Sequence, residues 1–329
     1  MDESPEVVRA LLRRQDGVLA RRQALQAGLD AADVRRMLRG RTWTTLLPGV
    51  YVDHTGRPSW TQDAWAAVLA TWPAALQGTS ALRAFDGPPP REGGPARPTI
   101  HVAVARRRAR PAPLAGVVVH QVARLDETVL WNLGPPRQRY PDAVLDAAAA
   151  AGTELDRVAV LARAAGSRRT TVAQVVAALA HRTRYPRRRW TEDVLRDAAA
   201  GTCSVLEHRY LVGVERAHGL PRARRQQREA GVTGVVYRDV ALGAAVVELD
   251  GRLHHDDPVA RDEDLERDLD VAVSGRATVR LGWGQVVGRP CRTATKVAAF
   301  LRQHGVEAYA RPCGPGCPVG RRPGSELAA

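Results

Sequence analysis

Three acidic residues in apolar surroundings are the strongest candidates for chemistry in this sequence: Asp239, Glu248 and Asp250. They lie in two apolar runs separated by a turn at Gly243, a pattern that predicts a β-hairpin. Side chains alternate along a strand, so Glu248 and Asp250 share one face, about 6.5–7 Å apart, and the hairpin brings Asp239 toward them. Burying unpaired carboxylates is costly, and Mg²⁺ and Mn²⁺ prefer carboxylate oxygens. We therefore expect a Mg²⁺ (or Mn²⁺) site here.

Residues close to this predicted site could assist a reaction at a phosphate. His255 follows the second strand and could act as general acid or base, because the pKa of histidine lies near neutral pH. Arg252 could hold a phosphate oxygen. Glu207 is a further candidate, although Ser204-x-x-Glu207 is also the pattern of a capping box, and both interpretations stay open.

The local charge agrees with a cation site. The segment 248–270 holds ten acidic residues and three arginines, a net charge of −7 in a chain whose formal charge is +14. For residues 262–270 a solvated acidic helix is the better explanation. It does not suit Glu248 and Asp250, which lie in a Val/Leu strand.

A family resemblance rests on these residues and their spacing, over about residues 200–305. The motifs are Ser204-x-x-Glu207, Tyr237-Arg238-Asp239, Val247-Glu248-Leu249-Asp250-Gly251-Arg252-x-His254-His255, Arg261-Asp262-x-x-x-x-Arg267-Asp268 and Val279-Arg280. They resemble domain-of-unknown-function family 559. That family is similar to the very-short-patch-repair branch of the restriction-endonuclease-like nucleases, the PD-(D/E)XK superfamily.

The resemblance implies a restriction-endonuclease-like core and roles for individual residues. Asp239 matches the metal-binding aspartate on the second core strand, and Glu248 and Asp250 fall where the superfamily has Glu-x-Lys. His255 matches a histidine just past that strand, and Glu207 matches an acid on the preceding helix. Asp250 replaces the lysine, as in the repair-like branch, which leaves open the group that orients the attacking water.

The basic residues point to a polyanionic partner. Lys and Arg number 49 against 35 Asp and Glu, and all but Lys296 are arginine, a bias typical of a high-GC coding sequence. The excess is concentrated in segments 106–110 and 184–190. Such runs attract phosphate backbones without reading sequence, although short Arg runs in loops are often only solvated surface. The candidate nucleic-acid contacts here are Arg106, Arg107 and Arg108.

The first fifty-five residues predict a small DNA-binding module. Helices are expected at 6–14, 20–27 and 31–39, followed by a β-ribbon at 43–52 with a Pro-Gly turn. This is the plan of a winged helix-turn-helix, and its third helix would offer Arg35, Arg36 and Arg39 to a DNA groove. The stretch from Gly17-Val18-Leu19 to Gly49-Val50-Tyr51-Val52 resembles the N-terminal domain of type IV toxin–antitoxin (abortive infection) antitoxins. The alternative is a helical module that only packs against the rest of the chain.

The expected fold class is α/β, or α+β overall, in successive parts. We predict a winged helix-turn-helix at 1–55, a mixed α/β antitoxin-like middle region at 56–185, a linker at 186–200, a restriction-endonuclease-like domain at 201–305 and a flexible tail at 306–329. In the middle region, strands at 100–104 and 117–120 carry His101 and His120, which we interpret as structural histidines.

Cysteine usage and hydropathy predict a cytoplasmic protein. Four cysteines are too few for a disulfide scaffold, and neither a signal peptide nor a membrane span is expected. Cys313 and Cys317 form a Cys-x₃-Cys pair, but zinc needs four ligands, and Cys203 and Cys291 are distant without knuckle spacing. The tail is therefore expected to be flexible and reduced.

Together these patterns predict a metal-dependent DNA endonuclease acting in DNA repair, phage defence or mobile-element processing. Its candidate partners are double-stranded DNA, a cognate toxin and a second copy of the chain, with no membrane. The first alternative is a non-catalytic DNA-binding transcriptional regulator or antitoxin with a vestigial nuclease fold. The second is an RNA nuclease or RNA-binding component, against which the lack of paired aromatic stacking motifs counts.

Overall fold

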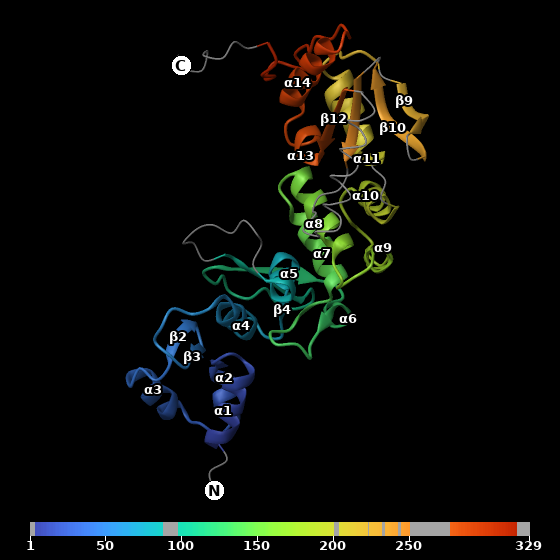
Figure 1. Cartoon of the computed structure of the whole chain (residues 1–329). Helices are drawn as coiled ribbons and strands as arrows, with labels where there is room; N and C mark the ends of the chain where they lie inside the picture. Colours follow the sequence, from blue (N-terminus) through green and yellow to red (C-terminus); the bar gives the residue numbers. More distant parts are fainter. Residues whose placement is uncertain are drawn as a thin grey trace, which may run out of the picture. The chain divides into compact units, whose positions relative to one another are not determined.

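The computed structural model describes residues 4–87, 98–200, 204–222, 224–231, 234–242, 245–250 and 277–320, and the side chains of 6–87, 98–198, 205–222, 245–250 and 277–320 (Figure 1). The chain has a mixed fold of helices and β-sheets. It divides into two compact units, one of Met1–Ala150 with Ala177–His181 and the other of Ala151–Val176 with Arg182–Ala329. Each unit is described by itself.

The first unit begins with three helices and a three-stranded sheet. The elements are α1 (Ser4–Arg14), β1 (Val18–Ala20), α2 (Arg21–Gln26), α3 (Ala31–Arg39), β2 (Thr44–Leu47) and β3 (Val50–Val52). The sheet order is β1-β3-β2, and both pairings are antiparallel. Val34 of α3 packs into a core with Leu19 and Val8, beside Trp43 stacked on Tyr51. The predicted helices and ribbon are present, and β1 is an additional strand.

The rest of the first unit is a five-stranded mixed sheet with helices. The elements are α4 (Trp60–Ala70), β4 (Ala75–Leu76), α5 (Gly78–Asp86), β5 (Ile100–Ala105), β6 (Val117–Val122), α6 (Leu125–Thr128), β7 (Val129–Leu130), β8 (Arg137–Gln138) and α7 (Tyr140–Ala150). The strand order is β6-β5-β4-β8-β7. Small side chains of α4, α5 and α7 pack against β4 and β5. Trp65 and Leu69 of α4 also pack on Val18 and Val52, so residues 1–55 share this compact unit.

The second unit starts with a run of helices. They are α8 (Glu154–Gly166), α9 (Val172–Ala180), which is divided between the units, α10 (Arg188–Ala200), α11 (Ser204–Tyr210) and a π-helical segment η1 (Leu211–Arg216). The linker predicted at 186–200 is instead mostly helix α10. Its Val194 and Leu195 are buried, and α10 packs against α8. The prediction relied on the Pro- and Arg-rich start of the segment and missed the apolar face that follows.

A four-stranded sheet forms the centre of the second unit. Its strands are β9 (Arg224–Gly231), β10 (Gly234–Leu242), β11 (Ala245–Asp250) and β12 (Ala277–Gly282), followed by α13 (Trp283–Val286) and α14 (Pro290–Gln303). The order is β12-β11-β10-β9, with antiparallel pairing except between β11 and β12, which are parallel. The predicted hairpin is present as β10 and β11. The acidic helix expected for residues 262–270 lies outside the described residues.

No described helix is both long enough and apolar enough to cross a membrane.

Candidate functional site

The two acidic residues of β11 share a face of the strand, as the alternation predicted. Val247 and Leu249 are 0 % and 4 % exposed, whereas Glu248 and Asp250 are partly exposed. Because successive side chains of a strand point to opposite faces, the apolar pair packs into the core while the two carboxylates share the other face. Helix α11 packs against this strand.

A cation from the neighbouring strand accompanies Glu248. Arg280 of β12 is the register partner of Glu248, and its Nη2 lies 3.6 Å from Oε2 of Glu248. Both side chains are partly exposed. At this separation the two groups form an ion pair that is longer than a typical hydrogen bond.

The strand register gives the position of Asp239, although its side chain lies outside the described ones. Val240 of β10 and Val247 of β11 are register partners. Asp239 immediately precedes Val240, and Glu248 immediately follows Val247. In the antiparallel hairpin, the backbone positions of Asp239 and Glu248 therefore both adjoin the pair formed by Val240 and Val247. Arg252 and His255 lie outside the described residues.

Glu207 lies on the helix predicted for it. Its neighbours Leu206 and Tyr210 are buried, and Glu207 itself is partly exposed on α11. The side chain of Ser204 is outside the described ones, so the capping-box and functional interpretations of Glu207 both stay open.

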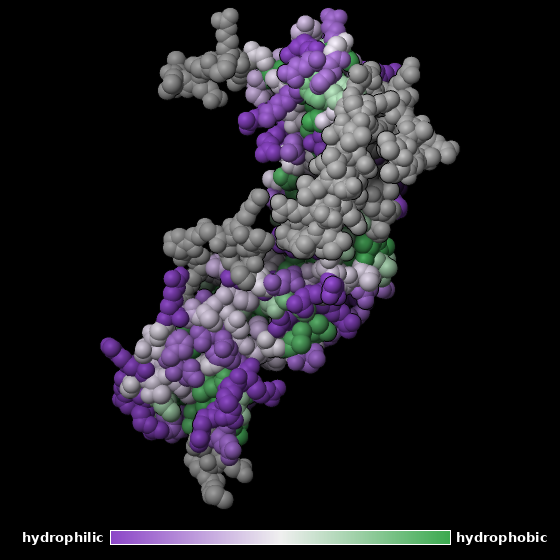
Figure 2. Space-filling view, in the orientation of Figure 1, coloured by the Kyte–Doolittle hydropathy of each residue, from purple (hydrophilic) through white to green (hydrophobic). Residues whose placement is uncertain are grey.

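The predicted basic contacts of α3 lie on its outer surface. Arg35, Arg36 and Arg39 are exposed while Val34 is buried, and Figure 2 shows a hydrophilic surface over this part of the first unit. Asp30 caps the helix by accepting a hydrogen bond from the backbone N–H of Asp33. The Asp33 carboxylate forms an ion pair with Arg36 at 2.5 Å. Arg35 and Arg39 are the other two exposed arginines of this helix.

The arginine run after β5 divides into surface and structural positions. Arg106 and Arg107 are exposed. Arg108 was predicted as a nucleic-acid contact, but its guanidinium donates hydrogen bonds to the carbonyl oxygens of Thr71 and Pro73. This residue therefore stabilises the segment after α4.

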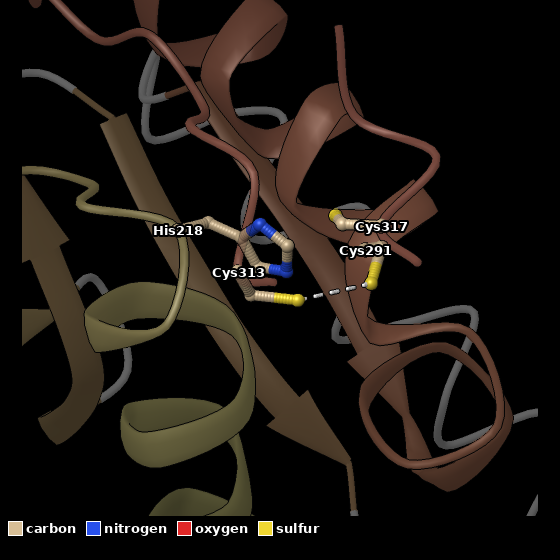
Figure 3. A group of neighbouring side chains, drawn as sticks. All are labelled: His218, Cys291, Cys313 and Cys317. Atoms are coloured by element: carbon tan, nitrogen blue, oxygen red, sulfur yellow. Dashed lines mark hydrogen bonds between the residues drawn. The ribbon is translucent and has the colours of Figure 1, made fainter. Parts of the chain in front are cut away.

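A second cluster, not predicted from the sequence, brings together His218, Cys291, Cys313 and Cys317 (Figure 3). Their candidate ligand atoms all lie within 4.8 Å of one another. His218 follows η1, Cys291 lies in the first turn of α14, and the other two cysteines belong to segment 306–320. This group could hold a metal ion, and nitrogen and sulfur donors are not the oxygen ligands that Mg²⁺ prefers.

The expectation of a flexible tail is therefore corrected for residues 306–320, where Cys313 and Cys317 belong to a group that could hold a metal ion. Ala308, Cys317 and Val319 are buried there. Cys291 is distant from Cys313 and Cys317 along the chain, and the spacing of the cysteines alone does not include His218. The fold brings Cys291 to the tail, and His218 completes the set of four.

The His218 ring is held in a defined orientation inside the cluster. Its Nδ1 lies 2.8 Å from the Arg311 carbonyl oxygen, and the Arg311 N–H donates to the His218 carbonyl at 2.8 Å. The imidazole Nε2 is buried and has no hydrogen-bond partner among the described residues. An Nδ1–H donor leaves a lone pair on Nε2 available to an ion.

The three thiols are reduced and crowd one another. The Sγ atoms of Cys291 and Cys313 are 3.7 Å apart, well beyond a disulfide bond. Burial, followed by the adjacent thiols of Cys317 and Cys313, raises the pKa of Cys291 to about 12. Burial acts to raise the pKa of Cys317 as well, but hydrogen bonds from the backbone of Cys313 and Val319 and from the other thiols lower it overall.

Comparison with known proteins gives the chain no relative from which a role could be transferred: no protein-family model matches it, and no curated protein matches it.

Proposed function

We propose that this chain is a metal-dependent DNA endonuclease whose hydrolytic centre lies at Asp239, Glu248 and Asp250. The observation that carries the proposal is the pairing of β10 and β11, which puts the position of Asp239 beside a strand face that bears both other carboxylates. The core of Val247 and Leu249 behind that face fixes the strand. The resemblance to the PD-(D/E)XK superfamily, which implies such a centre on neighbouring strands, supports the same assignment.

The donor set fits Mg²⁺ or Mn²⁺. Glu248 and Asp250 are partly exposed, so their oxygens can reach an ion that also keeps water ligands. A bound Mg²⁺ would polarise the scissile phosphate and lower the pKa of a bound water. The protein residues would hold this ion, while Arg280, already beside Glu248, supplies a positive charge for a phosphate oxygen.

The first unit would bind the duplex. Exposed arginines on α3 and after β5 provide a positive surface for phosphates, and helix α3 has the length and outward arginines expected of a groove-binding helix. Repair, phage defence and mobile-element processing are all compatible with such an enzyme.

A second candidate function is a non-catalytic DNA-binding regulator. The observation that favours it is the Glu248–Arg280 ion pair, since an arginine partner can neutralise a carboxylate without a metal. The aspartate at position 250, where the superfamily has lysine, points the same way.

Cleavage of supercoiled plasmid separates the two functions. We expect nicking that requires Mg²⁺ or Mn²⁺ and falls by about 100-fold or more in Asp239→Ala and Glu248→Gln, because each removes a ligand that holds the ion at the developing charge. Glu307→Gln is the matched control, since Glu307 is exposed in the same unit and should leave nicking unchanged. DNA binding without metal-dependent nicking in the wild type would contradict the enzyme and support the regulator.

A further inference from the structure

We propose that His218, Cys291, Cys313 and Cys317 bind one structural Zn²⁺ that fastens segment 306–320 to η1 and α14. The proposal stands apart from the acidic residues of β10 and β11, because it uses different donor atoms and different elements. It assigns a role to the two tail cysteines, which no part of the proposed nuclease uses.

The spacing of the sulfur atoms suits a tetrahedral ion. Zn–S bonds of about 2.3 Å put neighbouring sulfurs of a tetrahedron roughly 3.8 Å apart. The observed separation of the Cys291 and Cys313 Sγ atoms is 3.7 Å. The other ligand atoms lie within 4.8 Å of one another, so shifts of about 1 Å would complete the tetrahedron.

His218 presents the correct nitrogen for a ligand. Metal-binding histidines usually donate their other ring N–H to a carbonyl or carboxylate, which fixes the tautomer and the ring orientation. Nδ1 of His218 has this partner in the Arg311 carbonyl, while Nε2 is buried and unpartnered among the described residues. A buried ring nitrogen without a partner is unfavourable, and an ion would satisfy it.

The local backbone brings the three sulfurs to the histidine. The Cys317 N–H donates to the Gly314 carbonyl at 3.1 Å, and this turn folds Cys317 back beside Cys313. Cys291 follows Pro290 in the first turn of α14. The three thiols would give up their protons on binding the ion, whose positive charge offsets the repulsion between the thiolates so formed.

The donor set selects the metal and its role. Soft thiolate ligands with one imidazole favour Zn²⁺ over Mg²⁺, Ca²⁺ or Mn²⁺. Four protein ligands leave no open position for water or substrate, which is the arrangement of structural zinc. The ion would link the end of η1, the start of α14 and segment 306–320, in which the buried apolar side chains besides Cys317 are Ala308 and Val319.

Zinc content of the purified full-length chain is the first test. We expect about one zinc per chain by mass spectrometry, and at least a tenfold loss of affinity in His218→Asn and Cys317→Ser. His304→Asn and Cys203→Ser are matched controls, since His304 is exposed and Cys203 is the remaining cysteine of the chain, and both should retain zinc. Equal zinc content in wild type and both ligand variants would overturn the site.

A Co²⁺ titration of the zinc-stripped wild type tests the ligands without any variant. Thiolate-to-cobalt charge-transfer bands and intense visible bands are expected at one equivalent, as for a tetrahedral site with sulfur ligands. The absence of these bands would reject the proposal. So would a purified chain that contains no zinc and shows only two free thiols after denaturation instead of four, because two missing thiols indicate a disulfide. Full zinc content in Glu248→Gln keeps this result independent of the nuclease assignment.

Discussion

A single buried arginine illustrates how side-chain chemistry stabilises the first unit. Arg137 is 9 % exposed, and its Nε and Nη2 donate to the carbonyls of Pro135 and Gly134 at 3.1 and 2.9 Å. Its Nη1 donates to the Ala84 carbonyl, and the guanidinium lies 5.1 Å from the centre of the Phe85 ring. The planar fork thus ties β8 to the end of α5, which a lysine could not reproduce.

Replacing Arg137 should therefore cost substantial stability. We expect Arg137→Ala to lower the free energy of unfolding by about 2–4 kcal/mol, because three carbonyl oxygens lose a charged donor and a cavity is left. Arg137→Lys should recover only part of this loss. Urea unfolding followed by circular dichroism measures both, with the exposed Arg139→Ala as a control expected to stay within about 0.5 kcal/mol of wild type. A wild-type midpoint for Arg137→Lys would show that the fork geometry is unimportant.

At the scale of the element, helix α3 carries the DNA-binding hypothesis. Arg35 and Arg39 are exposed and point away from the core side of Val34, whereas Arg36 is already paired with Asp33. We expect Arg35→Ala and Arg39→Ala each to weaken duplex binding and to reduce the slope of log K against log salt by about 1. Fluorescence anisotropy at several salt concentrations measures both quantities.

The control for this experiment removes the same charge elsewhere. Arg196 is an exposed arginine of α10 in the second unit that pairs with Asp193 as Arg36 pairs with Asp33, and Arg196→Ala should leave the salt slope nearly unchanged. Equal losses for Arg196→Ala and the α3 variants would mean that binding follows net charge alone. The winged helix-turn-helix interpretation would then lose its support.

The same helix shows why some elements could be predicted from the sequence. Its N-cap at Asp30, its apolar positions at Val34 and Leu38 and the glycine after it are all local signals, and the structure begins and ends it at the predicted residues. The hairpin of β10 and β11 was predicted for the same reason. The two-residue strands β4, β7 and β8 have no periodicity to detect, since only their neighbours in the sheet define them.

The cysteine and histidine cluster could not be predicted in this way. Its ligands span residues 218–317, and their convergence depends on how η1, α14 and the tail pack. The tight Cys-Gly-Pro-Gly-Cys turn and a cysteine at a helix start were visible signals. Nothing in the sequence indicated that these cysteines lie close to His218. By local pattern, His218 is only the residue before Gly219, which ends a helix.

At the scale of the whole molecule, the two compact units contain different titratable clusters. The second holds the thiols, and the first holds a pair of histidines between β5 and β6. Nδ1 of His101 lies 3.0 Å from Nε2 of His120, and the rings stack with centroids 5.3 Å apart. Burial lowers the pKa of both, and for His120 the charges of His101 and Arg110 lower it further, against the opposing effect of Asp146.

This pair should make the first unit sensitive to mild acid. Each histidine pKa is lower in the folded chain than its ordinary value of about 6.5, so the unfolded chain binds more protons as the pH falls below that value. The contribution of the two neutral histidines to the free energy of unfolding is fully present above about pH 6.5. It declines as the pH decreases toward the lower pKa values that the two rings have in the folded chain. We expect the unfolding temperature to fall between pH 7.5 and 5, and to fall less in His120→Gln, whose amide cannot take up a proton.

The exposed His304 of the second unit provides the comparison that assigns this effect, because His304→Gln removes a histidine without touching the pair. That variant should keep the wild-type dependence of unfolding temperature on pH. If His120→Gln also keeps it, proton uptake by other groups of the chain must cause the acid sensitivity. The two rings would then bind no more protons in the unfolded chain than in the folded one over this pH range, and their lowered pKa values would not account for the fall in unfolding temperature.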